Sequence, residues 1–120
     1  MDFRNIPKKD SILEVAILKV KTALEASFEA DFIIASQYIS SIKGYEGHTL
    51  KKCIKTANQY ILLVNWKDLD SHEIGFRKSK AYLKWKQILH SYYDPFPTVE
   101  HYETVFEKDN NNSLIQKSLF

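Results

Sequence analysis

The sequence predicts an α+β domain in which four strands and two helical segments follow the order β-α-β-β-α-β. Three patterns indicate this order. Residues 60–64 are an unbroken aliphatic and aromatic run, which is typical of a buried strand. Apolar residues recur three and four positions apart across residues 24–42, which is the spacing of one helix face. Residues 98–106 alternate between apolar and polar side chains, as a half-buried strand does.

The length and composition of the chain restrict the class of protein. With 120 residues, 44% of them hydrophobic and 27% charged, the chain suffices for one ordinary globular domain. The 17 basic and 15 acidic residues leave a net charge of +2, so we do not expect a nucleic-acid partner. The single cysteine, Cys53, allows no disulfide within the chain, and no apolar run reaches membrane-spanning length. We therefore expect a cytoplasmic protein with no membrane partner.

The first half of the chain predicts a strand and a helix. Residues 12–20 form the strand, whose two faces are both apolar except at Glu14. A helix begins near Ala23. Its apolar stripe consists of Leu24, Phe28, Phe32, Ala35, Ile39 and Ile42. Gly44 is a typical terminating residue for this helix.

A hairpin is predicted next. Residues 48–56 form its more polar strand, and residues 57–59 connect it to the apolar strand that ends at Trp66. The polarity of the first of these strands indicates a sheet edge. Its lysines, which discourage edge-to-edge association, are Lys51, Lys52 and Lys55.

The second half of the chain predicts further helix and a last strand. Asp68 or Asp70 can cap a helix that continues to Phe76, and a second helical run covers residues 80–92. The predicted core stripe of that run is Leu83, Ile88 and Tyr92, with Trp85 alongside. A proline-containing segment ends the run before the strand at residues 98–106.

This order of elements is that of the ferredoxin-like fold, a four-stranded antiparallel sheet with helices on one face. We assign residues 11–106 to the domain, residues 1–10 to a flexible N-terminal arm and residues 107–120 to a C-terminal tail. The strands at 12–20 and 58–66 are apolar on both faces, so the second face of the sheet needs a cover. We therefore expect a homodimer in which two sheets pack face to face.

These motifs resemble the antibiotic biosynthesis monooxygenase superfamily over about residues 11–106. The segments that carry the resemblance are 28–30, 44–48, 60–66, Ser79 with Tyr82 and Trp85, and 97–102. The resemblance implies a dimeric α+β barrel with a pocket between helices and sheet in each subunit. Characterised members include cofactor-free oxygenases of phenols and quinols and related haem-degrading enzymes, whereas others have no known reaction.

The haem-degrading branch is implied to need an Asn on the first strand, a Trp at the end of the third and an iron-binding His on the last helix. Trp66 matches the Trp, but the other two positions fall near Ile17 and Lys86. Because a charged Lys is a poor iron ligand, we do not expect haem degradation, although His90 lies about one turn further along.

The predicted substrate-binding residues are mainly aromatic. They are Trp66, Phe76, Tyr82 and Trp85, with Asn65 as a weaker polar candidate because strand alternation turns it away from Trp66. A Trp at the end of a buried strand most often serves packing. In the functional interpretation, its indole N–H donates to the substrate.

His72 is the predicted catalytic base, because the unperturbed pKa of histidine lies nearest neutrality. A His near a helix start is more often exposed or capping, and His101, beside carboxylates on the last strand, is more often structural. His48 and His90 are weaker candidates. The four His and one Cys show no metal-ligand spacing, and no glycine-rich phosphate loop occurs, so we expect no metal and no cofactor.

The resemblance, together with the predicted aromatic-rich pocket, therefore implies a cofactor-independent monooxygenase that acts on a small aromatic, phenolic or quinol-like compound. The alternative is a non-catalytic dimeric protein that binds a small apolar ligand in the same cleft. A third hypothesis, a nucleic-acid-binding accessory protein, rests on the basic residues interleaved with aromatics at 77–90. Such a pattern is more often a solvated helix face.

Overall fold

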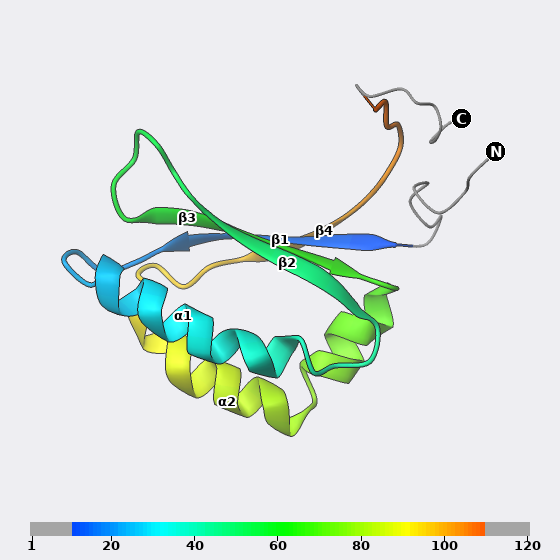
Figure 1. Cartoon of the computed structure of the whole chain (residues 1–120), viewed down its shortest axis with the longest axis horizontal. Coiled ribbons are helices and arrows are strands. Elements are labelled where there is room, and N and C mark those ends of the chain that lie inside the picture. The colour runs from blue at the N-terminus through cyan, green and yellow to red at the C-terminus, as the bar shows by residue number, and fades with distance from the viewer. Residues whose placement is uncertain (1–10, 110–120) are drawn as a thin grey trace.

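The computed structural model describes residues 11–109, so the predicted N-terminal arm and the tail from residue 110 lie outside the described part (Figure 1). The strands are β1 (Ile12–Lys19), β2 (Tyr45–Lys52), β3 (Gln59–Trp66) and β4 (Val99–Glu103). The helices are α1 (Glu25–Ile39), the π-helix η1 (Ser71–Phe76), α2 (Lys80–Leu89) and the 3-10 helix η2 (His90–Tyr92). The predicted order β-α-β-β-α-β is confirmed.

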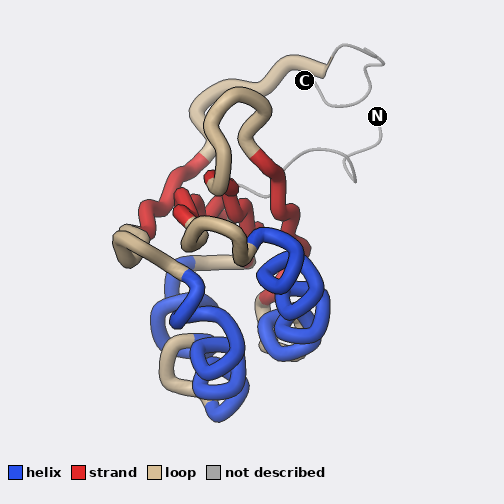
Figure 2. The backbone as a smooth tube through the Cα atoms, turned by 90° about the vertical axis from the view of Figure 1, so that its left-hand side faces the viewer, coloured by secondary structure: helices blue, strands red, loops and turns tan. Residues whose placement is uncertain are grey.

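The strands form one antiparallel sheet in the order β2-β3-β1-β4, which is the ferredoxin-like arrangement predicted from the sequence. Both α-helices pack on the same face of this sheet (Figure 2). The prediction that the polar strand lies at an edge is confirmed, because β2 pairs only with β3 in this sheet. The central strand β1 pairs with both β3 and β4, so it fixes the register of these two strands relative to each other.

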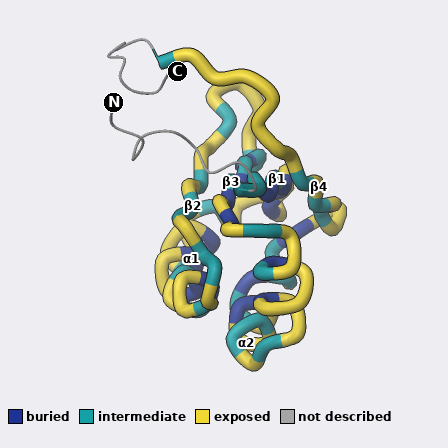
Figure 3. Tube along the Cα trace, turned by 90° about the vertical axis from the view of Figure 1, so that its right-hand side faces the viewer, coloured by how far each residue is buried: buried dark blue, intermediate teal, exposed yellow. Residues whose placement is uncertain are grey.

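Every second residue of β1 and β3 points toward the helices. The buried residues of these strands are Glu14, Ala16, Leu18, Tyr60, Leu62, Val64 and Trp66. Helix α1 covers them with Phe28, Phe32, Ala35 and Ile39, which confirms the centre of its predicted stripe. The buried residues lie mainly along β1, β3 and the two α-helices (Figure 3). No helix in the described part of the chain has both the length and the apolar character needed to cross a membrane.

Two predicted strand boundaries are wrong. Strand β2 begins at Tyr45 and ends at Lys52, because residues assigned to a turn already pair with the end of β3 across a bulge after Tyr45. Strand β4 ends at Glu103 and not at residue 106. The reason is that Glu103 pairs with Ile12, the first residue of β1, so no partner strand extends further.

The predicted core face of the second helical run is wrong only at Leu83, because Ile88 and Tyr92 pack partly buried against the core as predicted. Helix α2 buries Trp85 and Leu89, whereas Leu83 is 62% exposed. Trp85 sets the rotation of the helix because its ring packs edge-on against Phe32 and Phe76. An aromatic ring in the core therefore outweighs the placement of one leucine.

The second face of the sheet carries the intervening residues of β1 and β3. Its half-buried residues are Leu13, Val15, Ile61 and Leu63. Ile17 is 41% exposed and Tyr102 is 54% exposed on the same face. An apolar sheet face is therefore left partly open in a single chain, as the sequence predicts, and the expected homodimer stays a prediction.

Candidate functional site

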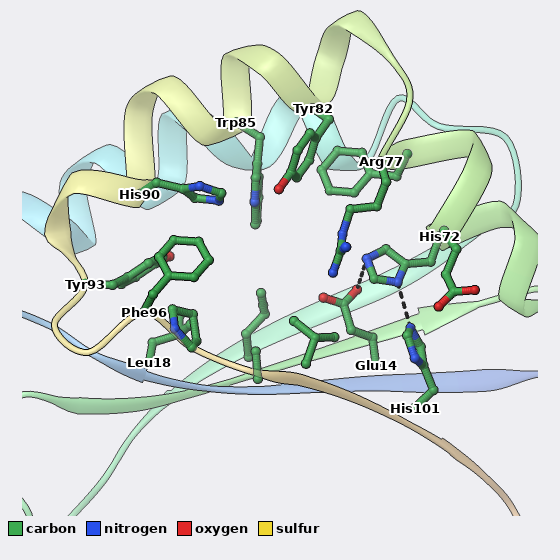
Figure 4. Close-up of a pocket in the computed structure, with 16 residues that line it drawn as sticks. Glu14, Leu18, His72, Arg77, Tyr82, Trp85, His90, Tyr93, Phe96 and His101 are labelled. Carbon is green, nitrogen blue, oxygen red and sulfur yellow. Dashed lines mark hydrogen bonds and ion pairs between the residues drawn. The ribbon is translucent and has the colours of Figure 1, made fainter.

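A cavity of about 430 Å³ lies between the sheet and α2 (Figure 4). Its walls have two different characters. One end is polar and contains Glu14, His72, Arg77 and His101. The other end is mainly aromatic and contains Tyr82, Trp85, His90, Tyr93 and Phe96 above Leu18.

Strand register brings the polar end together. Glu14 of β1 is the direct cross-strand partner of His101 on β4, so both side chains share the face covered by the helices. Trp66 ends β3 on the same face, and its indole Nε1–H donates to Glu14 Oε1 at 2.8 Å. The buried carboxylate therefore has a hydrogen-bond donor within the sheet, as a buried charge requires.

A tight turn brings η1 over the end of the sheet. The Asp68 carboxylate accepts hydrogen bonds from the Ser71 backbone N–H at 2.8 Å and from its hydroxyl at 2.7 Å, so Asp68 is the residue that fixes the start of η1. Gly44 permits this approach, because a Cβ there would lie only 2.1 Å from Ser71 Oγ. His72 follows Ser71 directly and is thereby carried into the polar end.

His72 is enclosed on all sides. The residue is 1% exposed, and its ring stacks on Trp66 with ring centroids 5.3 Å apart. Nδ1 lies 2.7 Å from His101 Nε2, and Nε2 lies 3.4 Å from Glu14 Oε1. Both ring nitrogens therefore face protein partners.

Burial controls the ionisation of the polar end. It lowers the pKa of His72 to about 3, and the positive charges of Arg77 and His101 act in the same direction. Burial raises the pKa of Glu14, while the Trp66 N–H and Arg77 oppose that rise. His72 is therefore neutral at pH 7, and its contact with Glu14 is a polar contact of neutral imidazole and not an ion pair.

Edge-on rings build the aromatic end. Phe76 lies edge-on to Tyr82 and Trp85 at centroid distances of 5.2 and 5.7 Å. His90 lies edge-on to Phe96 at 4.8 Å, and burial lowers the pKa of His90. Such surfaces accept planar aromatic molecules well. The cavity as a whole combines an aromatic wall with a buried acid–base end.

Four of the six predicted site residues line the cavity, namely His72, Phe76, Tyr82 and Trp85. Their roles toward a substrate stay predictions. Trp66 lies beneath His72 and does not line the cavity, because its ring is fully buried and its N–H is already donated to Glu14.

The prediction for Asn65 needs correction. Asn65 is exposed, while its neighbours Val64 and Trp66 on β3 are buried, because alternation along the strand turns it to the other face of the sheet. It is therefore not part of this cavity.

Three residues of the polar end were not singled out as site residues from the sequence. Glu14 left a signal there, because a lone carboxylate that interrupts the apolar face of a strand must be paired if it is buried. His101 was noted, but only the β1–β4 register places it opposite Glu14. Arg77 gave no signal apart from its position in a basic run.

The described residues hold no group of three or more His, Cys, Asp or Glu side chains arranged for a metal ion. A second polar cluster lies between α1 and β2. There His48 Nε2 lies 2.6 Å from Ser36 Oγ, and its Nδ1 contacts the Tyr45 hydroxyl. Ser36 lies within α1, where the backbone N–H groups are engaged in the helix, so no oxyanion-binding donors adjoin it. This cluster connects helix and sheet.

One known protein matches most of this chain in sequence. No family model matches the chain. The uncharacterised protein YczJ of Bacillus subtilis (strain 168) is 47% identical over 94 residues, which cover 78% of this chain and 99% of YczJ.

Solved structures with the same architecture extend this comparison. A Bordetella bronchiseptica structure, classed as an antibiotic biosynthesis monooxygenase, is 29% identical with a TM-score of 0.77, over 81% of this chain and 99% of that one. SnoaB of Streptomyces nogalater, a cofactor-independent oxygenase, is 23% identical with a TM-score of 0.62, over 84% of this chain and 97% of SnoaB. At 23% identity, the likeness to SnoaB shows a shared fold alone.

Proposed function

We propose that the chain, as a member of the antibiotic biosynthesis monooxygenase superfamily, is a cofactor-independent monooxygenase of a small phenolic or quinol-like aromatic compound. One observation carries the proposal: a single cavity joins an aromatic wall to a buried carboxylate whose pKa is raised. A phenol needs both features, since its ring requires an apolar surface and its hydroxyl requires a proton acceptor. SnoaB, which shares the fold, is a cofactor-independent oxygenase.

In the proposed reaction the polar end removes the phenolic proton. The electron-rich anion then forms a carbon–oxygen bond with dioxygen. The resulting peroxide anion takes the proton back from the polar end, and the hydroperoxide then loses water as its O–O bond and a C–H bond break, which leaves a quinone carbonyl. The substrate supplies all four electrons, and the two oxygen atoms end in the carbonyl and in water. The protein orients the ring, excludes water and holds the proton.

Tyr82 and Trp85 of α2 and Phe76 of η1 are the proposed ring-binding surface. Each lines the cavity, and Phe76 and Trp85 are at least nine-tenths buried. Ser79 fixes Tyr82 because its hydroxyl accepts the Tyr82 backbone N–H at 3.0 Å and thereby caps α2. His72 stays part of the proton-accepting end in this proposal.

We propose in addition that two copies associate through the open sheet face. The apolar residues on that face support this, since Ile17 and Tyr102 would otherwise stay in water beside half-buried Leu13 and Leu63.

Oxygen consumption by the purified, metal-stripped protein tests the reaction. The substrates are phenols, quinols and naphthalenols, and the matched variants are Trp85→Ala in the ring-binding surface and Leu83→Ala on the exposed face of the same helix. We expect uptake that falls at least 10-fold in Trp85→Ala and stays unchanged in Leu83→Ala. Tight binding of the same compounds without oxygen uptake would instead support the alternative, a dimeric small-ligand-binding protein.

A further inference from the structure

We infer that Glu14 is the proton acceptor of the cavity, and that His72 and His101 are positioning residues that hold its carboxylate. This inference rests on the proposed function, because it assigns the proton transfer of that same site. It replaces His72, the residue that the sequence predicts as the base, by the carboxylate beside it.

The first step concerns the nitrogens of His72. If His101 Nε2–H donates to His72 Nδ1 across their 2.7 Å contact, the proton of neutral His72 is on Nε2 and faces Glu14 Oε1. If His72 Nδ1–H donated to His101 instead, the free electron pair of Nε2 would face the electron pairs of the ionised Glu14 carboxylate, which is repulsive, so ionised Glu14 selects the first tautomer. In that tautomer both ring nitrogens of His72 are engaged within the protein, so neither can receive a proton from a ligand in the cavity.

The second step concerns the oxygens of Glu14. Trp66 Nε1–H and His72 Nε2 both contact Oε1, at 2.8 and 3.4 Å. Figure 4 shows the other carboxylate oxygen directed away from His72 and into the cavity. A carboxylate oxygen has electron pairs for further donors. Glu14 therefore presents an acceptor atom to a bound phenol, which His72 does not.

The third step is the charge of the polar end. Proton transfer from a phenol to an ionised carboxylate leaves one negative charge in the cavity before and after the step. Glu14 is faced by His72 and Arg77 from the η1 segment and by His101 from β4, with Tyr82 and His90 across the cavity. Arg77 lowers the pKa of Glu14 and so favours the ionised form that accepts the proton. Burial acts in the opposite direction and raises the pKa of Glu14 toward neutral pH. A general base works best when its pKa lies near the working pH.

The roles of His72 and His101 follow from this geometry. His101 lies opposite Glu14 on the neighbouring strand and fixes the ring orientation of His72. His72 in turn stacks on Trp66, so the two groups that contact Oε1 are held as one unit. Neither histidine touches the reacting atoms in this assignment.

The test compares kcat and KM over pH for the parent protein, Glu14→Gln, Glu14→Asp, His101→Gln and Glu103→Gln. In the parent, kcat/KM should fall as the pH drops through the pKa of Glu14. Glu14→Gln keeps an oxygen that accepts the Trp66 N–H, so it should lower kcat about 100-fold or more while KM changes only a few-fold, and the acidic decline should disappear. Glu14→Asp should retain the decline. His101→Gln should shift its position along the pH axis, and exposed Glu103→Gln should change nothing.

A second readout does not depend on turnover. Bound 4-nitrophenol reports its own ionisation through the different absorbance of phenol and phenolate. Beside a carboxylate the phenolate is disfavoured, so the pKa of bound 4-nitrophenol should be higher in the parent than in Glu14→Gln by about one unit or more. His72→Gln should keep most of that difference.

The possible failures are distinguishable. Absence of oxygen uptake together with the expected 4-nitrophenol shift would overturn the proposed function and leave Glu14 as the acceptor. An unchanged shift in Glu14→Gln, or an acidic decline that is lost in His72→Gln and kept in Glu14→Gln, would overturn the assignment of Glu14. A parent protein that neither binds 4-nitrophenol nor consumes oxygen contradicts both.

Discussion

Replacing Trp66 by Phe should destabilise the protein in a pH-dependent manner. Trp66 is fully buried, and its indole N–H makes the 2.8 Å hydrogen bond to Glu14 Oε1. Phe keeps an aromatic ring against His72 but has no donor. Loss of a hydrogen bond to a buried charged group costs about 1.5–3 kcal/mol, which corresponds to roughly 4–8 °C in Tm for each kcal/mol in a domain of this size.

The sign of the pH dependence follows from Glu14. Its pKa is raised in the folded protein above the ordinary 4.5, so the stability that it contributes is fully present below pH 4.5 and is lost as the pH rises through the folded-state value. The Trp66 N–H opposes that rise because it stabilises the ionised carboxylate. Without the donor, the pKa of Glu14 rises further. The penalty of Trp66→Phe should therefore be larger at pH 7 than at pH 4.

Urea unfolding of both proteins at pH 4 and pH 7 measures this difference. Trp85→Phe is the matched control, since Trp85 is also buried but packs at the other end of the cavity against Phe32 and Phe76. Its penalty should be the same at both pH values. Equal penalties for Trp66→Phe at pH 4 and pH 7, or a penalty under about 0.5 kcal/mol at pH 7, would refute the reasoning.

Three further changes have defined outcomes. Ile17→Lys places a charge on the open sheet face, so we expect sedimentation to detect a monomer in place of a dimer; a dimer that persists would contradict the proposed interface. Phe28→Ala removes a fully buried ring that packs against Tyr60 and should cost about 3–5 kcal/mol in urea unfolding, whereas a cost below about 1 kcal/mol would contradict the packing. Gly44→Ala forces a Cβ to within 2.1 Å of Ser71 Oγ at a φ of +93°, so we expect a loss of at least about 1 kcal/mol and weaker phenol binding; unchanged values for both would show that η1 can shift freely.

Sequence periodicity was sufficient for the fold because each element follows one strong pattern. The apolar residues of α1 recur at helical spacing, and the run that ends at Trp66 has the composition of a buried strand. The face of α2 could not be predicted in the same way. Its aromatic and aliphatic residues fit more than one rotation, and the contacts of Trp85 with Phe32 and Phe76 determine which of them is buried.

The candidate site was predictable only in part. Phe76, Tyr82 and Trp85 stand out as large aromatics near the predicted helices, and the structure places all three in the cavity wall. The pairing of Glu14 with His101 depends on strand register across 87 positions of sequence, which no local pattern records. Burial then reverses the expectation for His72, because a histidine with its pKa near 3 stays neutral throughout the physiological range.

The measurement that tests the central claim most directly uses isotopically labelled dioxygen. The metal-stripped protein is incubated with the phenol that supports the fastest oxygen uptake, in the presence of a chelator, and the product is examined by mass spectrometry. The proposed reaction predicts one labelled oxygen in the new carbonyl group and labelled water as the second product. No oxygen atom of the product should come from the solvent. Product that carries solvent oxygen, or an absence of product from every phenol that binds, would contradict cofactor-independent monooxygenation.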